Sequence, residues 1–155
     1  IANSPKVLIA DEPTTALDVT VQAQILEVIQ KVQKQFGTAV VLITHDLGVV
    51  ARVCERVNVM YAGRVVERAD IGELFEHPTH PYTRGLLASL PQVGSERLSP
   101  IAGFPPNMLR PPSGCAFRAR CPHAAAGCES EIPNLSPIGK SQSACIRAAE
   151  LAGTK

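Results

Sequence analysis

The chain has 155 residues, 45% of them hydrophobic, and a formal net charge of +1. This length and composition predict one packed domain, or a small domain with an extension. A charge so close to neutral, with 4% aromatic residues and no Trp, argues against a nucleic-acid partner and against a base-stacking surface. No apolar run approaches the roughly 18–20 residues that span a bilayer, and "IANSPKVL" at the start does not have the pattern of a signal peptide.

The first part of the chain alternates predicted strands and helices. Lys6–Ala10 is a continuous apolar run, which predicts a strand buried on both faces of a parallel sheet. A helix is expected from about Val19 to Gln35 with Gly37 as its stop, and "TAVVLIT", residues 38–44, predicts a second buried strand. The apolar face of this helix is expected to consist of Ile25, Val28, Ile29, Val32 and Phe36.

A short helix is expected next, capped by Asp46 and ending at Cys54. Its inward residues are expected to be Leu47, Val50, Ala51 and Cys54, with Cys54 a core residue rather than a ligand. "RVNVMYAGRVVE", residues 56–67, then predicts a strand, a turn at Ala62-Gly63 and a second strand. The order β-α-β-α-β-β indicates an α/β fold with a largely parallel sheet.

The composition changes in the second part of the chain, and we place a domain boundary between residues 69 and 70. Two short helices broken by Pro78 and Pro81 are expected first. Nine of the 13 prolines then lie between Pro91 and Pro137, so this region cannot form long helices or central strands. Residues 70–155 therefore form a loop-rich extension, which holds four of the five cysteines.

Acidic residues and a histidine follow the two predicted parallel strands. Asp11 and Glu12 come directly after the first strand and His45 directly after the second. Because the carboxyl ends of parallel strands lie at one edge of a sheet, we expect these side chains to meet there. Phosphoryl transfer needs such groups: a carboxylate for Mg²⁺, a second carboxylate for the attacking water, and a polar donor for the γ-phosphate. Alternatively, these residues have no catalytic role: Asp11 and Glu12 belong to an ordinary acidic loop, and Asp18 is a helix N-cap.

"VLIADEPTTALD" followed by "VLITHDLGVVARVCERVNVMYAGRVVE" resembles the second half of an ABC-transporter nucleotide-binding domain. The resemblance covers residues 1–69 and implies the C-terminal half of a P-loop fold that binds Mg-ATP. It implies that Asp11 is the Walker B aspartate, Glu12 the catalytic glutamate and His45 the switch histidine. "TALD", ending at Asp18, corresponds to the D-loop that faces the opposite subunit of an ATP sandwich. Thr15 replaces the usual Ser of this loop.

Two motifs of such ATPases are absent from the 155 residues. The nearest match to G-x-x-x-x-G-K-[ST] is "NLSPIGKS", in which Asn134 replaces the first Gly and Pro137 removes an N–H donor. We interpret it as an ordinary turn with Lys140 solvated. The Leu-Ser-Gly-Gly-Gln signature is also absent. The chain does not start with Met, so we expect it to be a fragment that is inactive alone and binds ATP weakly or not at all.

The tail has a resemblance of its own. "HPTHPYTRGLLASLP" and "GCAFRARCPHAAAGC" resemble the C-terminal extension of dipeptide and oligopeptide importer ATPases, a family whose relatives handle nickel and other small solutes. The resemblance implies a peripheral subunit on the cytoplasmic face of the membrane. Its partners would be a second ATPase subunit, transmembrane permease subunits and, indirectly, a solute-binding protein. We expect Pro81 to start a helix, Tyr82 and Leu86 to pack, and His77 and His80 to be structural rather than metal ligands.

The four cysteines of the tail, Cys115, Cys121, Cys128 and Cys145, are candidate metal ligands. Zinc modules use tighter pairs, and wider spacing suits an iron–sulfur cluster held by four thiolates. The family resemblance implies a [4Fe–4S] cluster, which some members of the family hold, with zinc or free or disulfide-bonded cysteines as alternatives and His123 as a substitute ligand. Arg118 and Arg120 are expected to offset the thiolate charge.

Two other functions are alternatives to a peptide-importer ATPase. A non-transport ABC-type ATPase would lack the "HPYT" stretch and the four-cysteine tail, so the tail argues against that function. Alternatively, the chain is a metal-binding interaction module without catalysis of its own. The sequence identifies neither the transported solute nor the partner ATPase.

Overall fold

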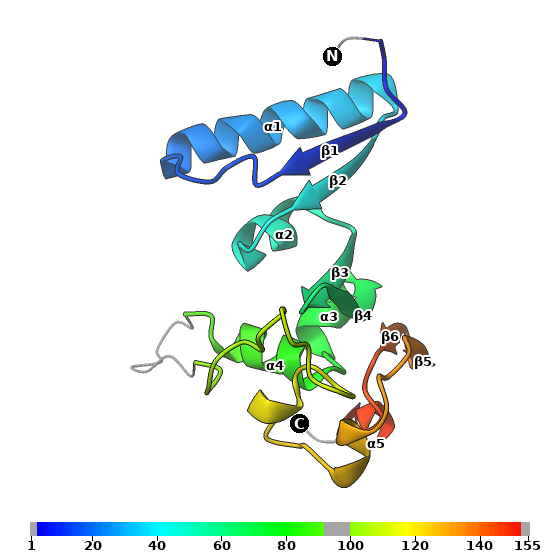
Figure 1. Ribbon diagram of the computed structural model, residues 1–155. Helices are drawn as coiled ribbons and strands as arrows, with labels where there is room; N and C mark the ends of the chain where they lie inside the picture. Colours follow the sequence, from blue (N-terminus) through cyan, green and yellow to red (C-terminus); the bar gives the residue numbers. More distant parts are fainter. Residues whose placement is uncertain (1–2, 92–99, 153–155) are drawn as a thin grey trace. The chain divides into compact units, whose positions relative to one another are not determined.

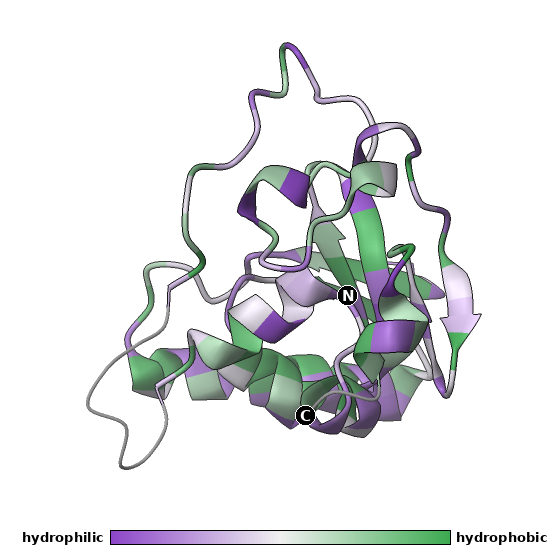
Figure 2. Cartoon of the chain, turned by 90° about the horizontal axis from the view of Figure 1, so that it is seen from below, coloured by the Kyte–Doolittle hydropathy of each residue, from purple (hydrophilic) through white to green (hydrophobic). Residues whose placement is uncertain are grey.

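The computed structural model describes residues 3–91 and 100–152 (Figure 1). The chain divides into two compact units, residues 1–55 and 56–155, which are described separately. Apolar and polar residues are interleaved along the helices and strands (Figure 2). Within the described residues no helix is both long and apolar enough to cross a membrane.

The first unit is a two-stranded parallel sheet with a connecting helix. Strands β1 (Val7–Asp11) and β2 (Ala39–Ile43) pair in parallel, in a register that runs from Val7 opposite Ala39 to Asp11 opposite Ile43. Helix α1 (Val19–Phe36) connects them, as a parallel pair requires. The α/β architecture expected from the sequence is therefore present in this unit.

Helix α1 has both predicted ends. The carboxylate of Asp18 accepts hydrogen bonds from the N–H groups of Thr20 and Val21, and Gly37 ends the helix in the left-handed region at φ 63°. The predicted apolar face was partly wrong, because Leu26 is the buried residue of the helix while Val28 and Phe36 are exposed. A sheet of two strands covers only a narrow stripe of the helix, so the outer apolar residues remain in contact with solvent.

The two strands are not buried on both faces, contrary to the prediction from their apolar runs. Burial alternates along β1 and β2, and one face is exposed. Within the described residues the bare face carries β-branched side chains that are about half exposed: Val7, Ile9, Val41 and Ile43. The strand type was predictable because β-branched runs fit a pleated surface, whereas burial depends on which elements cover each face.

A second capped helix completes the first unit. Helix α2 (Leu47–Val53) begins after Asp46, whose carboxylate accepts hydrogen bonds from the N–H groups of Gly48 and Val49. The cap was predicted correctly. The buried residues are Val49 and Val50, so only Val50 of the predicted inward face is fully buried, and Cys54 is half-buried at the helix end.

The second unit is built on a four-stranded antiparallel sheet in the order β3-β4-β6-β5. Ala62 and Gly63, both at positive φ, form the predicted turn between β3 and β4. The β3–β4 hairpin, which the sequence assigns to residues 1–69, thus pairs with strands from the tail. The strands are β3 (Arg56–Tyr61), β4 (Arg64–Asp70), β5 (Ser136–Ile138) and β6 (Ser141–Ser143).

The "NLSPIGKS" stretch is part of the β5–β6 hairpin, with Gly139 at φ 57° and Lys140 exposed in the turn. The interpretation as an ordinary turn is confirmed. Pro137 lies on the edge strand β5, where a missing N–H donor leaves no ladder bond unmade. The sequence did not predict β6, which is only three residues long and lies between β4 and β5.

Short helices lie on and around this sheet. Both helices predicted around Pro78 and Pro81 are present, as α3 (Ile71–Glu76) and α4 (Pro81–Ala88), and Pro81 begins α4 as expected. The cysteine-rich segment forms two 3₁₀ turns, η1 (Arg118–Arg120) and η2 (Ala126–Glu129), and α5 (Ala148–Ala152) follows the last cysteine.

The core of the second unit is an aromatic cluster with one fully buried leucine. The ring centroids of Tyr61 and Tyr82 lie 4.6 Å apart, and the Phe117 ring lies 5.3 Å from Tyr61 and 5.4 Å from Tyr82. Leu74 of α3 has no exposed surface in this cluster. Phe117 comes from between two of the tail cysteines, so the cysteine-rich segment is anchored to the core of the sheet.

We predict that Leu74→Ala lowers the free energy of unfolding by about 2–5 kcal/mol, because it leaves a cavity in this core. Leu109→Ala is the matched control, since Leu109 is 93% exposed, and it should change the free energy by less than about 0.5 kcal/mol. Urea denaturation of both variants checks this prediction. Equal effects of the two substitutions would contradict the described core.

Candidate functional site

Two groups of side chains qualify as functional, and the first lies at the carboxyl ends of β1 and β2. Asp11 is the last residue of β1. The backbone N–H of the next residue, Glu12, donates to the Ile43 carbonyl at 2.9 Å and so extends the pairing of the two strands. Glu12 has φ 44°, a region that a residue with a side chain rarely adopts and that is found at functional sites.

The Glu12 carboxylate has a partner at each oxygen. His45 Nδ1 lies 3.1 Å from Oε1, and Thr15 Oγ1 donates a hydrogen bond to Oε2 at 2.9 Å. His45 follows β2 directly, so the expected meeting of Glu12 and His45 at one edge of the sheet is confirmed. No pattern in the sequence predicted the contact from Thr15, which depends on how residues 12–16 turn back, with Ala16 also at positive φ.

These contacts favour the ionised carboxylate. The hydrogen bond from Thr15 is the largest cause that holds the pKa of Glu12 below its ordinary value, and the hydrogen bond with His45 acts in the same direction. A carboxylate that is charged and fixed at both oxygens can orient a water molecule or accept its proton. It cannot act as a general acid near neutral pH.

The other predicted residues of this group also have roles in the local structure. Asp18 caps α1, which is the structural role that the sequence offered as an alternative to a functional one. Asp46, the cap of α2, accepts a weak hydrogen bond from Gln22 Nε2 at 3.4 Å and so links the two helices. Asp11 is exposed at the end of β1, beside Glu12. Nothing in these positions conflicts with the roles that the resemblance implies.

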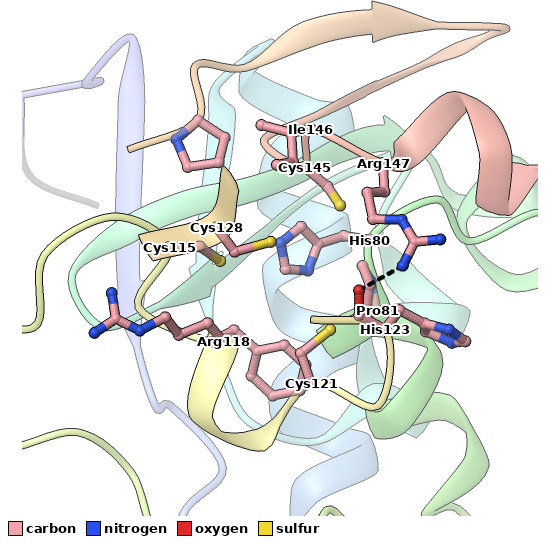
Figure 3. Close-up of a pocket in the computed structure, with 12 residues that line it drawn as sticks. His80, Pro81, Cys115, Arg118, Cys121, His123, Cys128, Cys145, Ile146 and Arg147 are labelled. Carbon is pink, nitrogen blue, oxygen red and sulfur yellow. Dashed lines mark hydrogen bonds between the residues drawn. The ribbon is translucent and has the colours of Figure 1, made fainter. Parts of the chain in front are cut away.

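The second group lies in the other unit, where the four tail cysteines line one pocket with His80 and His123 (Figure 3). The candidates are thus brought together, although the last of them is far from the others in sequence. Cys115 and Cys128 are tied directly, because the Cys115 N–H donates to the Cys128 carbonyl at 2.8 Å. Gly114, at φ 65°, allows this approach, since a Cβ there would overlap the backbone of Cys128 and Glu129.

Backbone N–H groups hydrogen-bond to three of the four thiols. Cys121 receives one from His123, Cys145 one from Arg147, and Cys115 two, from Phe117 and Arg118. Each of these N–H groups belongs to a residue two or three positions after the cysteine, and each favours the thiolate. Burial is nevertheless the larger effect, and it raises the pKa of all three thiols. The pKa values of these three thiols therefore lie above the ordinary value of a cysteine.

Arginines hold the loops around this pocket. Arg118 donates to the Ser113 carbonyl, and Arg147 Nη1 donates to the His123 carbonyl at 2.9 Å. Arg120, predicted to offset thiolate charge, instead donates to the carbonyls of Ala102 and Ile101 and does not line the pocket. Arg118 and Arg147 line the pocket, and their charges favour the thiolates of Cys115 and Cys121 respectively.

No three His, Cys, Asp or Glu side chains of residues 3–91 and 100–152 are placed so that they could hold a metal ion. A zinc ion needs all its sulfur ligands about 2.3 Å from one point, so this arrangement does not match a zinc site as it stands. An iron–sulfur cluster places each thiolate on a different iron and so needs sulfurs that surround a larger volume.

His80, expected to be structural, is buried beside these cysteines. Its Nδ1 accepts a hydrogen bond from the Tyr82 N–H at 3.1 Å, and the backbone of Ala144 acts on the ring in the direction that raises its pKa. Burial lowers the pKa of His80 to about 4, so the ring is neutral at physiological pH. His77 differs, because its side chain is 62% exposed and lies 3.7 Å from Glu73.

A buried carboxylate that the sequence analysis did not single out holds His80 in place. Glu67 of β4 has no exposed surface, and its oxygens accept hydrogen bonds from Thr79 N (2.7 Å), Thr79 Oγ1 (2.8 Å) and His80 N (2.9 Å). The two-residue alternation of a strand could have identified it from the sequence. Glu67 lies on the same face of β4 as Val65 and Ala69, which are partly or fully buried. An acidic residue at such a position indicates a buried hydrogen-bonding site.

Comparison with known proteins identifies relatives of this arrangement. Residues 66–128 match the family described as "Oligopeptide/dipeptide transporter, C-terminal region". A putative peptide import ATP-binding protein of Brucella melitensis is 49% identical over 158 residues, covering 96% of this chain and 47% of the relative. The dipeptide transport ATP-binding protein of Bacillus subtilis is 54% identical over 132 residues, covering 83% of this chain and 39% of the relative.

The chain is similar to the ATP-binding proteins of peptide ABC transporters over most of its own length. It spans about half the length of the curated relatives it matches. Among solved structures, CbiO1 of Clostridium perfringens, part of the ABC transporter complex CbiONQ, is 39% identical with a TM-score of 0.43, over 46% of this chain and 28% of that chain. The matched family and the similar ATP-binding proteins confirm the resemblance expected from "VLIADEPTTALD" and from the tail.

We predict that Thr15→Val raises the pKa of Glu12 toward its ordinary value. The Thr15 hydroxyl donates to the ionised carboxylate and so favours the charged form, and valine keeps the shape of the side chain without the donor. A carboxyl-detected NMR titration of the chain measures this pKa. Thr20→Val serves as control, because Thr20 contributes its backbone N–H to Asp18. An unchanged Glu12 pKa in Thr15→Val would show that the Thr15 hydroxyl does not hold the carboxylate.

Proposed function

We propose that this chain is the part of an ATP-hydrolysing transporter subunit that carries the catalytic carboxylate. The observation that supports this most directly is the 3.1 Å contact between Glu12 and His45 at the ends of two neighbouring parallel strands, in a chain related to peptide-transport ATP-binding proteins. In this proposal Glu12 and His45 are catalytic, Asp11 holds Mg-ATP, and Asp18 belongs to a D-loop that faces a second ATPase subunit.

Each residue has a role that its surroundings support. Glu12, ionised and held by Thr15 and His45, orients the attacking water and accepts its proton. The exposed carboxylate of Asp11 lies next to it in sequence, at the same edge, and is a suitable ligand for magnesium. When bound, Mg²⁺ would neutralise charge on the phosphates. The 155 residues contain no G-x-x-x-x-G-K-[ST] loop to cradle those phosphates, so we propose that this chain alone does not bind ATP tightly.

The transported substrates are proposed from the relatives. Proteins named for peptide, oligopeptide and dipeptide transport are 48–54% identical to this chain, which supports import of di- or oligopeptides, or of related small solutes. The partners would then be transmembrane permease subunits and a second ATPase subunit, with a solute-binding protein acting indirectly. The subunit would lie peripherally on the cytoplasmic face of the membrane. The match of the tail to a transporter family makes a non-transport ATPase the weaker alternative.

We predict that Glu12→Gln lowers ATP turnover roughly 10²–10⁴-fold, the usual contribution of a positioned general base. The test uses a chimera in which this chain replaces the matching region of the Bacillus subtilis relative, which supplies the remaining sequence. Phosphate release by the purified chimera is the measurement.

The matched control is Glu27→Gln, which removes a carboxylate from the exposed face of α1, where Glu27 pairs with Lys31. This variant should turn over ATP at the rate of the parent chimera. An active chimera in which Glu12→Gln has no effect would rule out the proposed role of Glu12, and tight ATP binding by the 155-residue chain alone would contradict the proposed division of the site.

We also propose that Cys115, Cys121, Cys128 and Cys145 hold a [4Fe–4S] cluster, with zinc as the alternative occupant. Support comes from the shared pocket, from the N–H groups directed at three of the sulfurs, and from the charges of Arg118 and Arg147. The cluster would be structural: it would close the loops of the tail by joining residues that are far apart in sequence. If the chain has no catalytic role, this site is what remains of its function, as a metal-binding interaction module.

We predict that the chain purified without oxygen carries about four iron atoms and shows the broad visible absorbance of an iron–sulfur chromophore. Cys121→Ser should lose the iron, because it removes one of the proposed ligands. Cys54→Ser should keep it, because Cys54 lies in the other unit, at the end of α2. Iron analysis and the visible spectrum check both variants, and a colourless chain with stoichiometric zinc would overturn the cluster in favour of the alternative.

A further inference from the structure

Each of the four pocket cysteines begins or ends a four-residue turn. In every turn the last N–H donates to the first carbonyl, over 2.9–3.2 Å. In chain order these are the first turn (115–118), the second (121–124), the third (125–128) and the fourth (145–148). The first three belong to one segment, in which the Cys115 N–H also binds the Cys128 carbonyl. The fourth lies beyond the β5–β6 hairpin, so contacts between turns must hold Cys145 at the pocket.

The two central residues of the fourth turn, Ile146 and Arg147, contact the second and third turns. Arg147 Nη1 donates to the carbonyl of His123, a central residue of the second turn, at 2.9 Å (Figure 3). Ile146 lies against Gly127 in the third turn, where an added Cβ would be 3.0 Å from Ile146 Cδ1. The residues that follow Cys145 thus join it to the segment that carries the other three cysteines.

The guanidinium of Arg147 is held in one orientation. Its Nε and Nη2 both lie 2.8 Å from Glu150 Oε2, which leaves Nη1 to bind the His123 carbonyl. Because a guanidinium is planar, the pair with Glu150 sets the direction in which Nη1 points. Arg147 also lines the pocket, so the same group that joins the two turns places a positive charge beside the thiols.

The other side of Cys145 is held by the sheet. The Ala144 N–H donates to the Val66 carbonyl of β4 at 2.8 Å, which extends the pairing of β4 with β6. This bond fixes where the fourth turn begins, but it joins the turn to the sheet rather than to the other turns. Ile146 is 45% exposed and makes an apolar contact without directional preference. The bond from Arg147 therefore adds direction to the contact between the turns.

We propose that Arg147 is a positioning residue, whose guanidinium joins the turn of Cys145 to the turn of Cys121 and so closes the cysteine pocket. The closure is a property of the metal-free chain. Where the pocket holds a cluster, the inference rests on the proposed function, and Arg147 then places the last of the four ligands. The role belongs to the hydrogen-bond geometry of the guanidinium and not to its charge alone.

Two substitutions separate this role from its alternatives. Arg147→Lys keeps the charge but loses the fork, because one ammonium on a flexible chain cannot hold Glu150 and His123 in the same geometry. Glu150→Gln removes the ion pair but keeps an oxygen that accepts from Nε, and the pair itself is largely exposed. If Arg147 acts by charge alone, Arg147→Lys should behave as the parent. If it only stabilises α5 through the ion pair, both variants should be equally damaging.

The first readout uses the metal-free, reduced chain. Iodoacetamide alkylates the cysteines, and mass spectrometry gives the rate at Cys145 relative to Cys115, which its own bond to the Cys128 carbonyl holds. Arg147→Lys should raise this ratio roughly tenfold, the usual effect of losing a hydrogen bond from a charged donor. Glu150→Gln should stay near the parent ratio.

Leu74→Ala, which loosens the core of the whole unit, gives the ratio expected from general unfolding. An unchanged ratio in Arg147→Lys, an equal rise in Glu150→Gln, or a ratio in Arg147→Lys that matches that of Leu74→Ala would each overturn the proposal.

The second readout uses the chain after anaerobic reconstitution with iron and sulfide. Arg147→Lys should lose iron to a chelator roughly 10- to 100-fold faster than the parent, the usual effect of removing a group that orients a ligand, while Glu150→Gln should lose it at the parent rate. A parent chain that takes up no iron would refute the proposed cluster without touching the alkylation result. Equal rates of iron loss in the parent and in Arg147→Lys would refute the positioning role instead.

Discussion

The second unit depends on a carboxylate that has no contact with water. Glu67 is buried in β4 and is satisfied by neutral donors from the loop before α4 rather than by a cation. A buried carboxyl group is tolerated only when its oxygens are hydrogen-bonded, so the loop cannot move without leaving these oxygens unpaired. The strand, the start of α4, the aromatic core and the end of β6 are therefore fixed together, and the cysteine pocket lies against this assembly.

The first unit has a different organisation, in which residues of the proposed catalytic site also hold the local structure. Asp18 and Asp46 cap helices, and Glu12 continues the pairing of two strands while its side chain meets His45. A carboxylate held by Thr15 and His45 is oriented before any substrate arrives, and this lowers the cost of reaching a productive geometry. The left-handed backbone conformation of Glu12 is unfavourable in energy, and it accompanies that orientation of the side chain.

Much of the fold and of the first site could be predicted from the sequence because the signals are local. Helix ends follow from Asp18, Gly37 and Asp46, and the meeting of Glu12 with His45 follows from the shared edge of parallel strands. Burial could not be predicted, as the exposed Val28 and the bare face of β1 show, because it depends on which other elements lie against each face.

The tail was harder to predict because its structure depends on contacts that are distant in sequence. The cysteine spacing indicated a shared site, but nothing local indicated that Ser141–Ser143 joins β4 or that Glu67 binds the Thr79-His80 backbone. The prediction for the arginines was also partly wrong. Arg147, near the last cysteine, lines the pocket, while Arg120 donates to the carbonyls of Ile101 and Ala102.

The bare face of β1 and β2 determines how this chain behaves as an isolated molecule. Four β-branched side chains, Val7, Ile9, Val41 and Ile43, form a flat apolar surface on a sheet of only two strands, and two strands alone are marginally stable in water. Such a surface attracts other apolar surfaces, including that of another molecule of the same chain. Self-association should therefore increase with concentration, and polar substitutions on this face should reduce it before they affect either proposed site.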